Sequence, residues 1–473
     1  MEKRNYLLNV VEYMTLIILF MINNEDRLFG FTLTYLLYKV LFSIYKKIDI
    51  KKNILKYKNK DNMFRNKGYI YSIIVLFIYG ILGMGISFLV SLLLDKVLTI
   101  NKMIVPLIVV SIVAVIRPFL DITRDLLLTY NKRKLVSCIH YIYYGIDSIL
   151  TIVIYAIICR LKMPMYIFIS MLYIPKIIAF VIVTSLCLVI CYKKKTGKNK
   201  YSLFEFREVW KDVSDSLVVS DSVKYGYFYI SFIILYIVLV NRYAYKIEDV
   251  YNIMVVGYLG CLNIILLISD SIKYFTNRIC SKYSLGNKLV YLLEICLPLV
   301  IWVIIMAKYI YMLLFGNIDS YSILMSFSLL ILFIVFYDIM EEEYLRVRRD
   351  INKYLIWGIV IMAITIVPFI DSFYRMGYNL INGSIVSTIL GISITLILLV
   401  FKIKPINRDI VNKYFEKFVM IIYRNIILCF VLVVLQLFIK FNSSRMFSLI
   451  IIVIYIGIML GYFKFKKRGI KDE

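Results

Sequence analysis

Histidine is nearly missing from this chain, since His140 is the only one among 473 residues. Catalytic triads and most zinc sites depend on histidine, so its scarcity argues against both. The eight cysteines lie mostly inside apolar segments. Cys187 and Cys191 share a helix face at i and i+4, but no further ligand type accompanies them, which favours packing. We therefore expect no metal, no cofactor and no catalytic residue.

Charge is also scarce. Charged residues make up 18% of the chain and hydrophobic residues 62%, with a mean hydropathy of +0.84. An ordinary soluble domain carries roughly 25% charged residues. A soluble protein of this length could not bury so much apolar surface. The composition therefore predicts an all-α polytopic membrane protein.

Long apolar runs recur from one end of the sequence to the other, and each approaches the roughly 20 residues that cross a hydrocarbon core. They predict fourteen spanning helices. These helices are expected at 6–22, 28–45, 69–94, 103–128, 137–159, 166–192, 224–244, 251–271, 289–315, 322–340, 354–370, 380–401, 418–439 and 446–463.

The net charge of +26 could indicate nucleic acid, but the placement of the basic residues argues against that partner. About 40 of the 56 lysines and arginines fall in every second connection and at the two ends, and about 10 fall in the opposite connections. This alternation is the positive-inside pattern. It predicts a protein of the bacterial cytoplasmic membrane with both termini in the cytoplasm, and we expect a monomer.

The connections themselves limit the function. Those on the predicted outer side are short, and the two longer polar segments, 46–68 and 193–223, lie on the cytoplasmic side. An outer active-site domain has no room in such a chain. A monomeric transporter fits this layout better than an enzyme.

A weak internal sequence repeat supports a chain built of two similar halves. Asp121-Ile122 precedes Leu128 and a basic cluster, and Asp338-Ile339 precedes Leu345 and a second basic cluster. The copies lie six spans apart and therefore share one orientation, as in parallel transporter repeats. The expected organisation is a first lobe at 1–192, a cytoplasmic linker at 193–223, a second lobe at 224–401 and two accessory helices at 402–473.

Ionisable residues inside a membrane are costly, at roughly 2.5–3.5 kcal/mol each on insertion scales, and they usually face an interior or a partner. Lys176 is the most informative, because it follows Pro175 in the middle of an apolar span. Two interpretations remain open for it: a residue of a substrate cavity, or one half of a salt bridge between helices. Lys308 is its counterpart in the second half.

Other intramembrane charges are less specific. Arg117 and Asp121 stand at i and i+4 and are either a structural pair or cavity residues. Lys39 and Asp338 lie near helix ends, where snorkelling to the interface is the favoured interpretation. Carboxylates that could couple transport to an ion are Glu12, Asp147 and Asp338.

The loops and helix ends resemble those of the polysaccharide-transporter branch of the multidrug/oligosaccharidyl-lipid/polysaccharide flippase superfamily. Arg124 holds the arginine position of that branch's Arg-Gly-aromatic-x-Gln-Gly stretch, whose glycines and glutamine are replaced here. Gly316 holds the glycine of a Leu-Phe-Gly turn. Asn382-Gly383-Ser384 match the start of the twelfth helix, and 278–288 is similar to the loop after the eighth.

The resemblance implies two pseudo-symmetric six-helix lobes arranged in a V, a central cavity and alternating access, with two extra C-terminal helices. The expected substrate is an undecaprenyl-pyrophosphate-linked oligosaccharide or polysaccharide precursor, surrounded by membrane lipids. Cationic side chains would bind its pyrophosphate. The residues expected to do so are Lys176, Lys308, Arg117, Asp121, Lys39 and Arg124.

Two further functions stay open. A cation-coupled multidrug antiporter of the same superfamily would use buried carboxylates to exchange protons or sodium. A membrane glycosyltransferase or polymerase would need an acidic pair beside the membrane, and Glu25-Asp26 in the first outer connection is such a pair.

Overall fold

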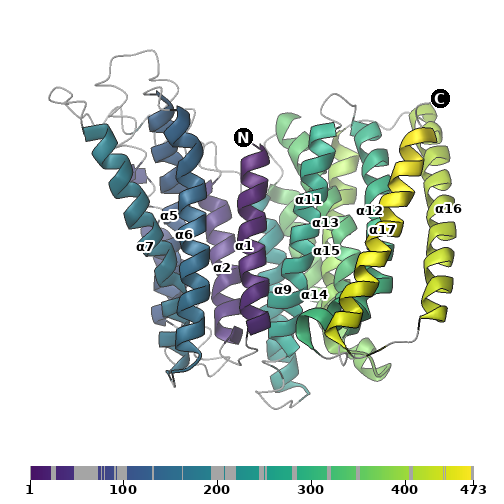
Figure 1. Cartoon of the computed structure of the whole chain (residues 1–473), viewed down its shortest axis with the longest axis horizontal. Helices are drawn as coiled ribbons and strands as arrows, with labels where there is room; N and C mark the ends of the chain where they lie inside the picture. The colour runs from purple at the N-terminus through teal and green to yellow at the C-terminus, as the bar shows by residue number, and fades with distance from the viewer. Residues whose placement is uncertain are drawn as a thin grey trace. The chain divides into compact units, whose positions relative to one another are not determined.

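The computed structural model describes twelve main segments of the chain. These are residues 2–22, 28–46, most of 73–89, 104–129, 133–192 except 162, 220–243, 253–279, 285–316, 321–347, 352–403, 408–439 and 444–469. Within these segments every regular element is helical (Figure 1). The predicted all-α class is therefore confirmed.

The helices reproduce the predicted spans. Among the described residues, nine helical stretches are long and apolar enough to cross a membrane. Shorter apolar helices lie at Asn9–Ile22, Leu28–Phe42, Ile73–Leu89, Ile104–Ile116 and Tyr225–Asn241, the third of them described only in part. Together these segments coincide in order with the fourteen spans expected from hydropathy. The chain is a polytopic membrane protein.

The chain divides into two compact units, Leu7–Val255 and Val256–Glu473 with Met1–Tyr6. The first unit contains most of α1 (Glu2–Ile22). Its other helices are α2 (Leu28–Lys46), α5 (Ile104–Thr129), α6 (Arg133–Ile158), α7 (Met165–Tyr192) and α9 (Ser220–Asn241).

α2 is the central helix of the first unit and packs against α5, α7 and α9. Its segment Leu28–Phe42 is buried all round, apart from the half-buried Val40. Phe29 stacks on Phe232 of α9 at 5.4 Å between ring centroids, and the Thr34 and Tyr173 hydroxyls are 3.0 Å apart across to α7. A helix that is apolar and buried on every side belongs in the interior of a bundle.

The position of α9 differs from the expected domain layout. The sequence placed 224–401 together in a second lobe, whereas α9 packs along α2 and falls in the first compact unit. The aromatic contacts of Phe29 with Phe232 and Tyr236 account for this attachment. The six-helix division of the lobes stays a prediction.

The second unit begins in a π-helical stretch, η1 (Val255–Cys261), which runs directly into α11 (Leu262–Ile279). The helices that follow are α12 (Leu285–Phe315), α13 (Tyr321–Val347), α14 (Asn352–Arg375), α15 (Leu380–Ile403), α16 (Arg408–Phe438) and α17 (Arg445–Gly469). α13 packs against α11, α12 and α15, and α14 packs along α15.

Two glycines shape this unit. Gly316 has φ of +76°, as expected for the sharp turn after α12, because glycine adopts the left-handed region without a Cβ penalty. Gly383 lies where α15 meets α14, and a Cβ there would be 2.7 Å from the Ile370 Cα. The Asn-Gly-Ser match in the sequence thus marks a close helix crossing.

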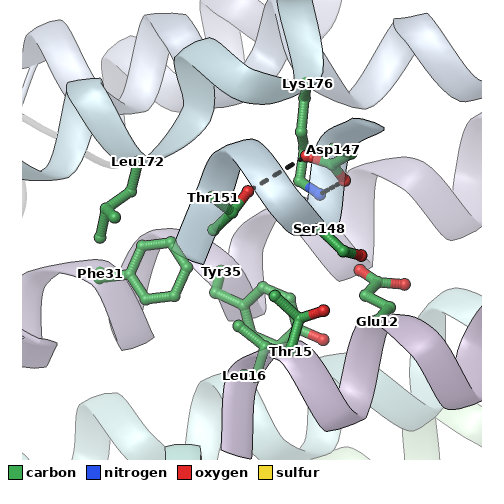
Figure 2. A pocket seen from close by; sticks show the side chains of 10 residues that line it. All are labelled: Glu12, Thr15, Leu16, Phe31, Tyr35, Asp147, Ser148, Thr151, Leu172 and Lys176. Carbon is green, nitrogen blue, oxygen red and sulfur yellow. Dashed lines mark hydrogen bonds and ion pairs between the residues drawn. The ribbon is translucent and has the colours of Figure 1, made fainter. Parts of the chain in front are cut away.

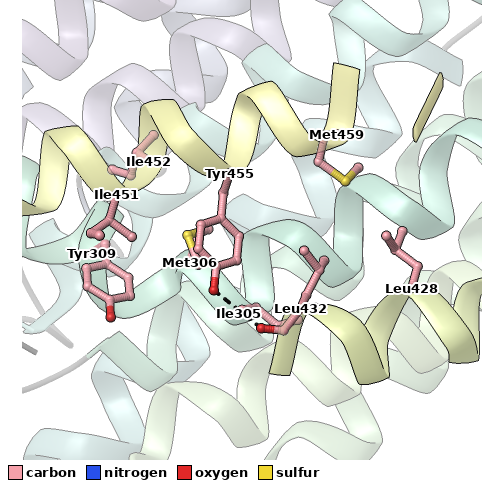
Figure 3. Packing of buried hydrophobic residues seen from close by; sticks show 9 residues of the cluster. All are labelled: Ile305, Met306, Tyr309, Leu428, Leu432, Ile451, Ile452, Tyr455 and Met459. Carbon is pink, nitrogen blue, oxygen red and sulfur yellow. Dashed lines mark hydrogen bonds between the residues drawn. The ribbon is translucent and has the colours of Figure 1, made fainter. Parts of the chain in front are cut away.

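The two C-terminal helices are attached through α12. An apolar cluster joins the three helices and consists of Ile305, Met306, Tyr309, Leu428, Leu432, Ile451, Ile452, Tyr455 and Met459 (Figure 3). Within it the Tyr455 hydroxyl donates to the Leu432 carbonyl at 3.3 Å. The far side of α16 carries exposed apolar residues, among them Phe430 and Leu437 at 69% and 81% exposure. Such a surface suits a lipid environment.

Candidate functional site

An ion pair between α6 and α7 is the centre of the candidate site. The Lys176 Nζ lies 2.6 Å from Oδ2 of Asp147, and the Thr151 hydroxyl donates to Oδ1 of the same carboxylate at 3.3 Å. Asp147 is 5% exposed and Lys176 is 14% exposed. Of the two interpretations open for Lys176, the interhelical salt bridge is therefore present, and the pair also lines a cavity.

The local sequence explains how these two residues meet. α6 ends at Ile158, and α7 begins at Met165 directly after Pro164, so the two helices form an antiparallel hairpin. Asp147 lies eleven residues before the end of α6, and Lys176 lies eleven residues after the start of α7. At a rise of about 1.5 Å per residue, both side chains fall at the same height above the turn.

Pro175 interrupts the hydrogen bonding of α7 at the level of the ion pair. It lies inside α7 immediately before Lys176. Proline has no N–H, so one carbonyl a turn earlier lacks its helical donor and the helix bends there. The ammonium of Lys176 therefore emerges at an irregular point of the helix.

A second buried pair repeats the arrangement between α1 and α2. The Lys39 Nζ lies 2.8 Å from Oε2 of Glu12, with the side chains 3% and 6% exposed. The same ammonium lies 5.2 Å from the ring centroid of Tyr13, 5.3 Å from that of Tyr35 and 6.0 Å from that of Tyr225. Aromatic faces attract a cation at such distances.

The snorkelling interpretation of Lys39 is therefore wrong. The residue is two turns from the end of α2, as the sequence indicated, but its side chain turns inward to Glu12. Leu28–Phe42 is covered by its neighbours almost throughout, and the Lys39 side chain within it is 3% exposed. Burial of the whole helix, which hydropathy could not reveal, decides the orientation.

A small cavity lies between these helices. It is lined by Glu12, Thr15, Leu16, Phe31, Tyr35, Asp147, Ser148, Thr151, Leu172 and Lys176 (Figure 2). Its volume open to water-sized molecules is about 20 Å³. Ligand pockets for organic molecules measure roughly 300–1,000 Å³, whereas about 10–15 Å³ suffices for one water. In this conformation the cavity is a site for water or a small ion and cannot hold a saccharide.

The charges around the cavity balance. Two carboxylates, Glu12 and Asp147, face two ammonium groups, Lys39 and Lys176. The sequence left open whether Lys176 lines a substrate cavity or forms one half of a salt bridge, and it favoured snorkelling for Lys39. Within the described part of this unit, both of these lysines are already neutralised by a carboxylate of the neighbouring helix. An incoming anion must therefore compete with Asp147 or Glu12.

Of the remaining predicted site residues, those whose side chains the structure describes are not among the residues that line this cavity. Asp338 on α13 is 4% exposed and pairs with Lys273 of α11 at 3.7 Å, in the second unit. Lys308 is half-buried on α12, also in the second unit. Arg117, Asp121 and Arg124 belong to the described helix α5, but their side chains lie outside what the structure describes.

Sequence reasoning missed Tyr35, Thr15 and Ser148. Tyr35 is the most informative, because it is 4% exposed and its hydroxyl has no hydrogen-bond partner in the described part of the chain. Its spacing of four from Lys39 placed it on the same helix face, which is the signal that could have identified it.

Comparison with known proteins is informative only at the level of structure. No protein-family model and no curated protein matches the sequence. A lipid II flippase MurJ in an inward closed conformation matches with a TM-score of 0.61 and 14% identity, covering 97% of each chain. An inward-facing multidrug resistance MATE family transporter of the MOP superfamily matches at 0.56 and 14%, covering 83% of this chain and 92% of its own. A MOP superfamily transporter from Pyrococcus furiosus matches at 0.52 and 13%, covering 85% and 94%.

The chain shares its fold with these transporters. The matches differ in the share of this chain that they cover. The match to the flippase leaves 3% of this chain uncovered. That share is shorter than either α16 or α17, so the matched region includes residues of both helices. The multidrug transporter leaves 17% uncovered.

Proposed function

We propose that this protein is a transporter that moves a lipid-linked saccharide of the undecaprenyl-pyrophosphate type across the bacterial cytoplasmic membrane by alternating access. The observation that carries the proposal is the match of the MurJ flippase fold along nearly the whole chain, including the two C-terminal helices. At 14% identity this likeness concerns the fold, so the substrate rests on the chemistry of the site.

The chemistry of the proposed substrate suits Lys176. A pyrophosphate offers localised negative charge and several acceptor oxygens, and charge-assisted hydrogen bonds to it are strong. Lys176 keeps 14% of its side-chain surface exposed, compared with 3% for Lys39. We therefore assign the exchangeable role to Lys176, which would leave Asp147 for the pyrophosphate. Lys39 would stay with Glu12 and fix α2 against α1.

Binding of a saccharide head group requires the site to open, since the cavity now measures about 20 Å³. In alternating access the helices that line the cavity, which all belong to the first unit, would have to separate to admit the head group. In this proposal Lys308 and Asp338 provide the charged groups of the second lobe, and Arg117, Asp121 and Arg124 those of α5. The proposed topology places both termini and the lysine-rich connections in the cytoplasm.

A second function has one specific observation in its favour. Glu12 and Asp147 are buried carboxylates that line one cavity, which is the arrangement that a cation-coupled multidrug antiporter needs. The fold match to a MATE family transporter agrees with it. Against it stand the ammonium groups that already occupy both carboxylates. We regard a group-transfer enzyme as the weaker proposal, because both carboxylates at the cavity are held in ion pairs.

Reconstitution into vesicles tests the proposal directly. Purified protein is placed in proteoliposomes with a fluorescent undecaprenyl-pyrophosphate-linked saccharide, and an enzyme outside the vesicles trims only outward-facing sugar. We expect the protein to accelerate translocation over protein-free vesicles and Lys176→Ala to abolish the gain. Equal rates with and without protein would refute the flippase. Export of an organic cation in the same vesicles, with no saccharide movement, would establish the antiporter.

A further inference from the structure

The hydroxyl of Tyr35 is a buried polar group at the cavity for which the described residues provide no hydrogen-bond partner. Tyr35 lines the cavity, is 4% exposed, and has no hydrogen-bond partner among the described residues. Leaving a buried hydroxyl unsatisfied costs roughly 1–3 kcal/mol, so buried polar groups nearly always have a partner. Because Tyr35 lines the cavity, a molecule bound there that accepts this hydrogen bond would satisfy the hydroxyl.

Size and charge identify that occupant. The cavity of about 20 Å³ exceeds the roughly 10–15 Å³ that one water molecule requires, and it is far below the size of an organic ligand. The carboxylates of Glu12 and Asp147 are already balanced by Lys39 and Lys176, so no net charge remains to attract a metal ion or an anion. A neutral polar guest satisfies both conditions.

We propose that this cavity binds one water molecule, which accepts a hydrogen bond from Tyr35 and donates to the carboxylates of Glu12 and Asp147, and that this water delivers a proton to Asp147 during transport. Ser148, Thr15 and Thr151 also line the cavity and offer further hydrogen-bonding oxygens. A buried water typically makes about three hydrogen bonds, which this lining supplies.

The proton step follows from charge balance, and it rests on the proposed function. When Lys176 moves its ammonium to the pyrophosphate, the Asp147 carboxylate is left buried without a counter-charge, which is strongly unfavourable. One proton from bulk solvent then enters at the exposed side of Lys176 and passes through the water to an Asp147 oxygen. Asp147 becomes neutral and Lys176 stays charged. When Lys176 returns, the proton leaves to the opposite side of the membrane, so each transport cycle moves one proton across.

The charged and titratable groups around Asp147 and the cavity allow this proton transfer. Lys176 comes from α7, Glu12 from α1, Tyr35, Tyr38 and Lys39 from α2, and Thr151 from its own helix. α5 also packs against α6 and α7, and its described side chains (104–116, 119, 120 and 123) include no ionisable group. The described surroundings thus supply one cation, Lys176, in direct contact with Asp147.

A matched pair of tyrosine variants tests the water site without any substrate. Tyr229 of α9 is also buried, at 8%, and its hydroxyl also lacks a partner among the described residues, but it does not line the cavity. Tyr35→Phe should lower the Tm of the purified protein, because the hydrogen bond to water is lost. Tyr229→Phe should leave the Tm unchanged or raise it. If Tyr35→Phe leaves the Tm unchanged or raises it, the hydroxyl has no guest and the proposal fails.

Infrared spectroscopy tests the proton. Acidification of the purified protein should produce a protonated-carboxyl band that Asp147→Asn removes. Tyr35→Phe should shift that band, whereas Tyr229→Phe should not. Absence of an Asp147 band, or a band indifferent to Tyr35→Phe, would overturn the proposal. Stabilisation of the wild type by sodium chloride relative to choline chloride would overturn it in favour of a sodium ion.

Vesicles then connect the site to transport. An imposed pH gradient should accelerate saccharide translocation by the wild type and by Tyr229→Phe, and Tyr35→Phe should lose that acceleration. Translocation driven by a sodium gradient alone would contradict the proton. If the infrared and thermal results hold while no saccharide moves in any vesicle, the water site stands and the proposed substrate falls.

Discussion

The Nζ atom of Lys176 lies 2.6 Å from Oδ2 of Asp147, at equal distances from the turn that joins α6 to α7. The Lys39–Glu12 pair follows the same rule, because Glu12 lies ten residues before the end of α1 and Lys39 eleven residues after the start of α2. Both ion pairs therefore connect successive antiparallel helices at matching heights. They differ in their surroundings: three aromatic rings lie around Lys39, whereas among the described residues one ring, that of Tyr38 at 5.8 Å, lies over Lys176.

The first prediction concerns Lys176. Lys176→Met keeps the length of the side chain and removes the ammonium, so Asp147 is left buried without its partner. Breaking a buried pair in this way costs about 3–5 kcal/mol. We expect a lower Tm and no saccharide export, with membrane insertion unchanged. Thermal unfolding in detergent, the vesicle assay and the membrane-integrated fraction measure the three effects.

The double variant Lys176→Met with Asp147→Asn separates structure from transport. It has no uncompensated charge, so most of the lost stability should return, while export should stay absent because the cation that binds pyrophosphate is missing. Normal export by this double variant would remove Lys176 from the substrate site.

The second prediction concerns the Lys39–Glu12 pair, to which we assign a structural role. Either Lys39→Gln or Glu12→Gln alone should lower the free energy of unfolding by about 3–5 kcal/mol, because one buried charge remains. The double variant should regain most of that stability. Glu12→Gln keeps a side-chain oxygen that can accept the hydrogen bond of the cavity water, so export should stay near the wild-type rate. A stable double variant that exports nothing would place Lys39 among the residues that bind substrate.

Hydropathy predicted the order and positions of the spans, because each apolar run is long and is separated from the next by polar residues. It also selected Lys176 and Asp147 as buried charges. It did not pair them, since apolar periodicity reports depth in the membrane and not the neighbouring helix. Counting residues from the short turn would have paired them. No such count reveals that α2 is surrounded, which is why the snorkelling interpretation of Lys39 failed.

The domain layout shows the same limit. A break in hydropathy and charge at 193–223 marks a connection, but it does not say which helices pack together. Aromatic contacts between Phe29 of α2 and Phe232 of α9 determine that attachment. Such pairs lie about two hundred residues apart in the chain and leave no local pattern.

The third prediction concerns the crossing of α14 and α15. A Cβ at Gly383 would lie 2.7 Å from the Ile370 Cα and 2.8 Å from its backbone nitrogen, and backbone cannot move aside as a side chain can. Overpacking of this kind costs about 1–3 kcal/mol. Gly383→Ala should therefore lower the Tm.

Gly457 on α17 is the matched control for Gly383. It is also a helical glycine in the second unit, and no atom lies within 4 Å of a Cβ built there. Gly457→Ala should be neutral or stabilising by about 0.5–1 kcal/mol, because alanine favours the helix. Equal losses at both positions would mean that helix crossing is not the cause.

The fourth prediction concerns Lys308 of α12. It is half-buried next to the cluster that attaches α17, in the apolar C-terminal two thirds of α12 that follow Glu294. If its charge serves the second lobe, Lys308→Ala should abolish export while insertion is unchanged, and Lys308→Arg should restore part of it. A purely structural lysine would instead lower the Tm in proportion to the loss of export, and Lys308→Met would then restore both by packing.

The fifth prediction concerns topology, on which the direction of transport depends. The native cysteines are replaced by serine, and one cysteine is introduced at a time, either Ser202→Cys in the lysine-rich connection or Ser443→Cys between α16 and α17. With both termini in the cytoplasm, an even number of spans separates the N-terminus from the first site and an odd number from the second. A membrane-impermeant maleimide should therefore label Ser443→Cys in intact cells and Ser202→Cys only after permeabilisation.

The fourfold enrichment of basic residues on one side makes an inverted topology unfavourable, since positively charged loops resist translocation. Labelling of Ser202→Cys in intact cells would invert the topology and with it the access of Lys176 to a substrate made in the cytoplasm.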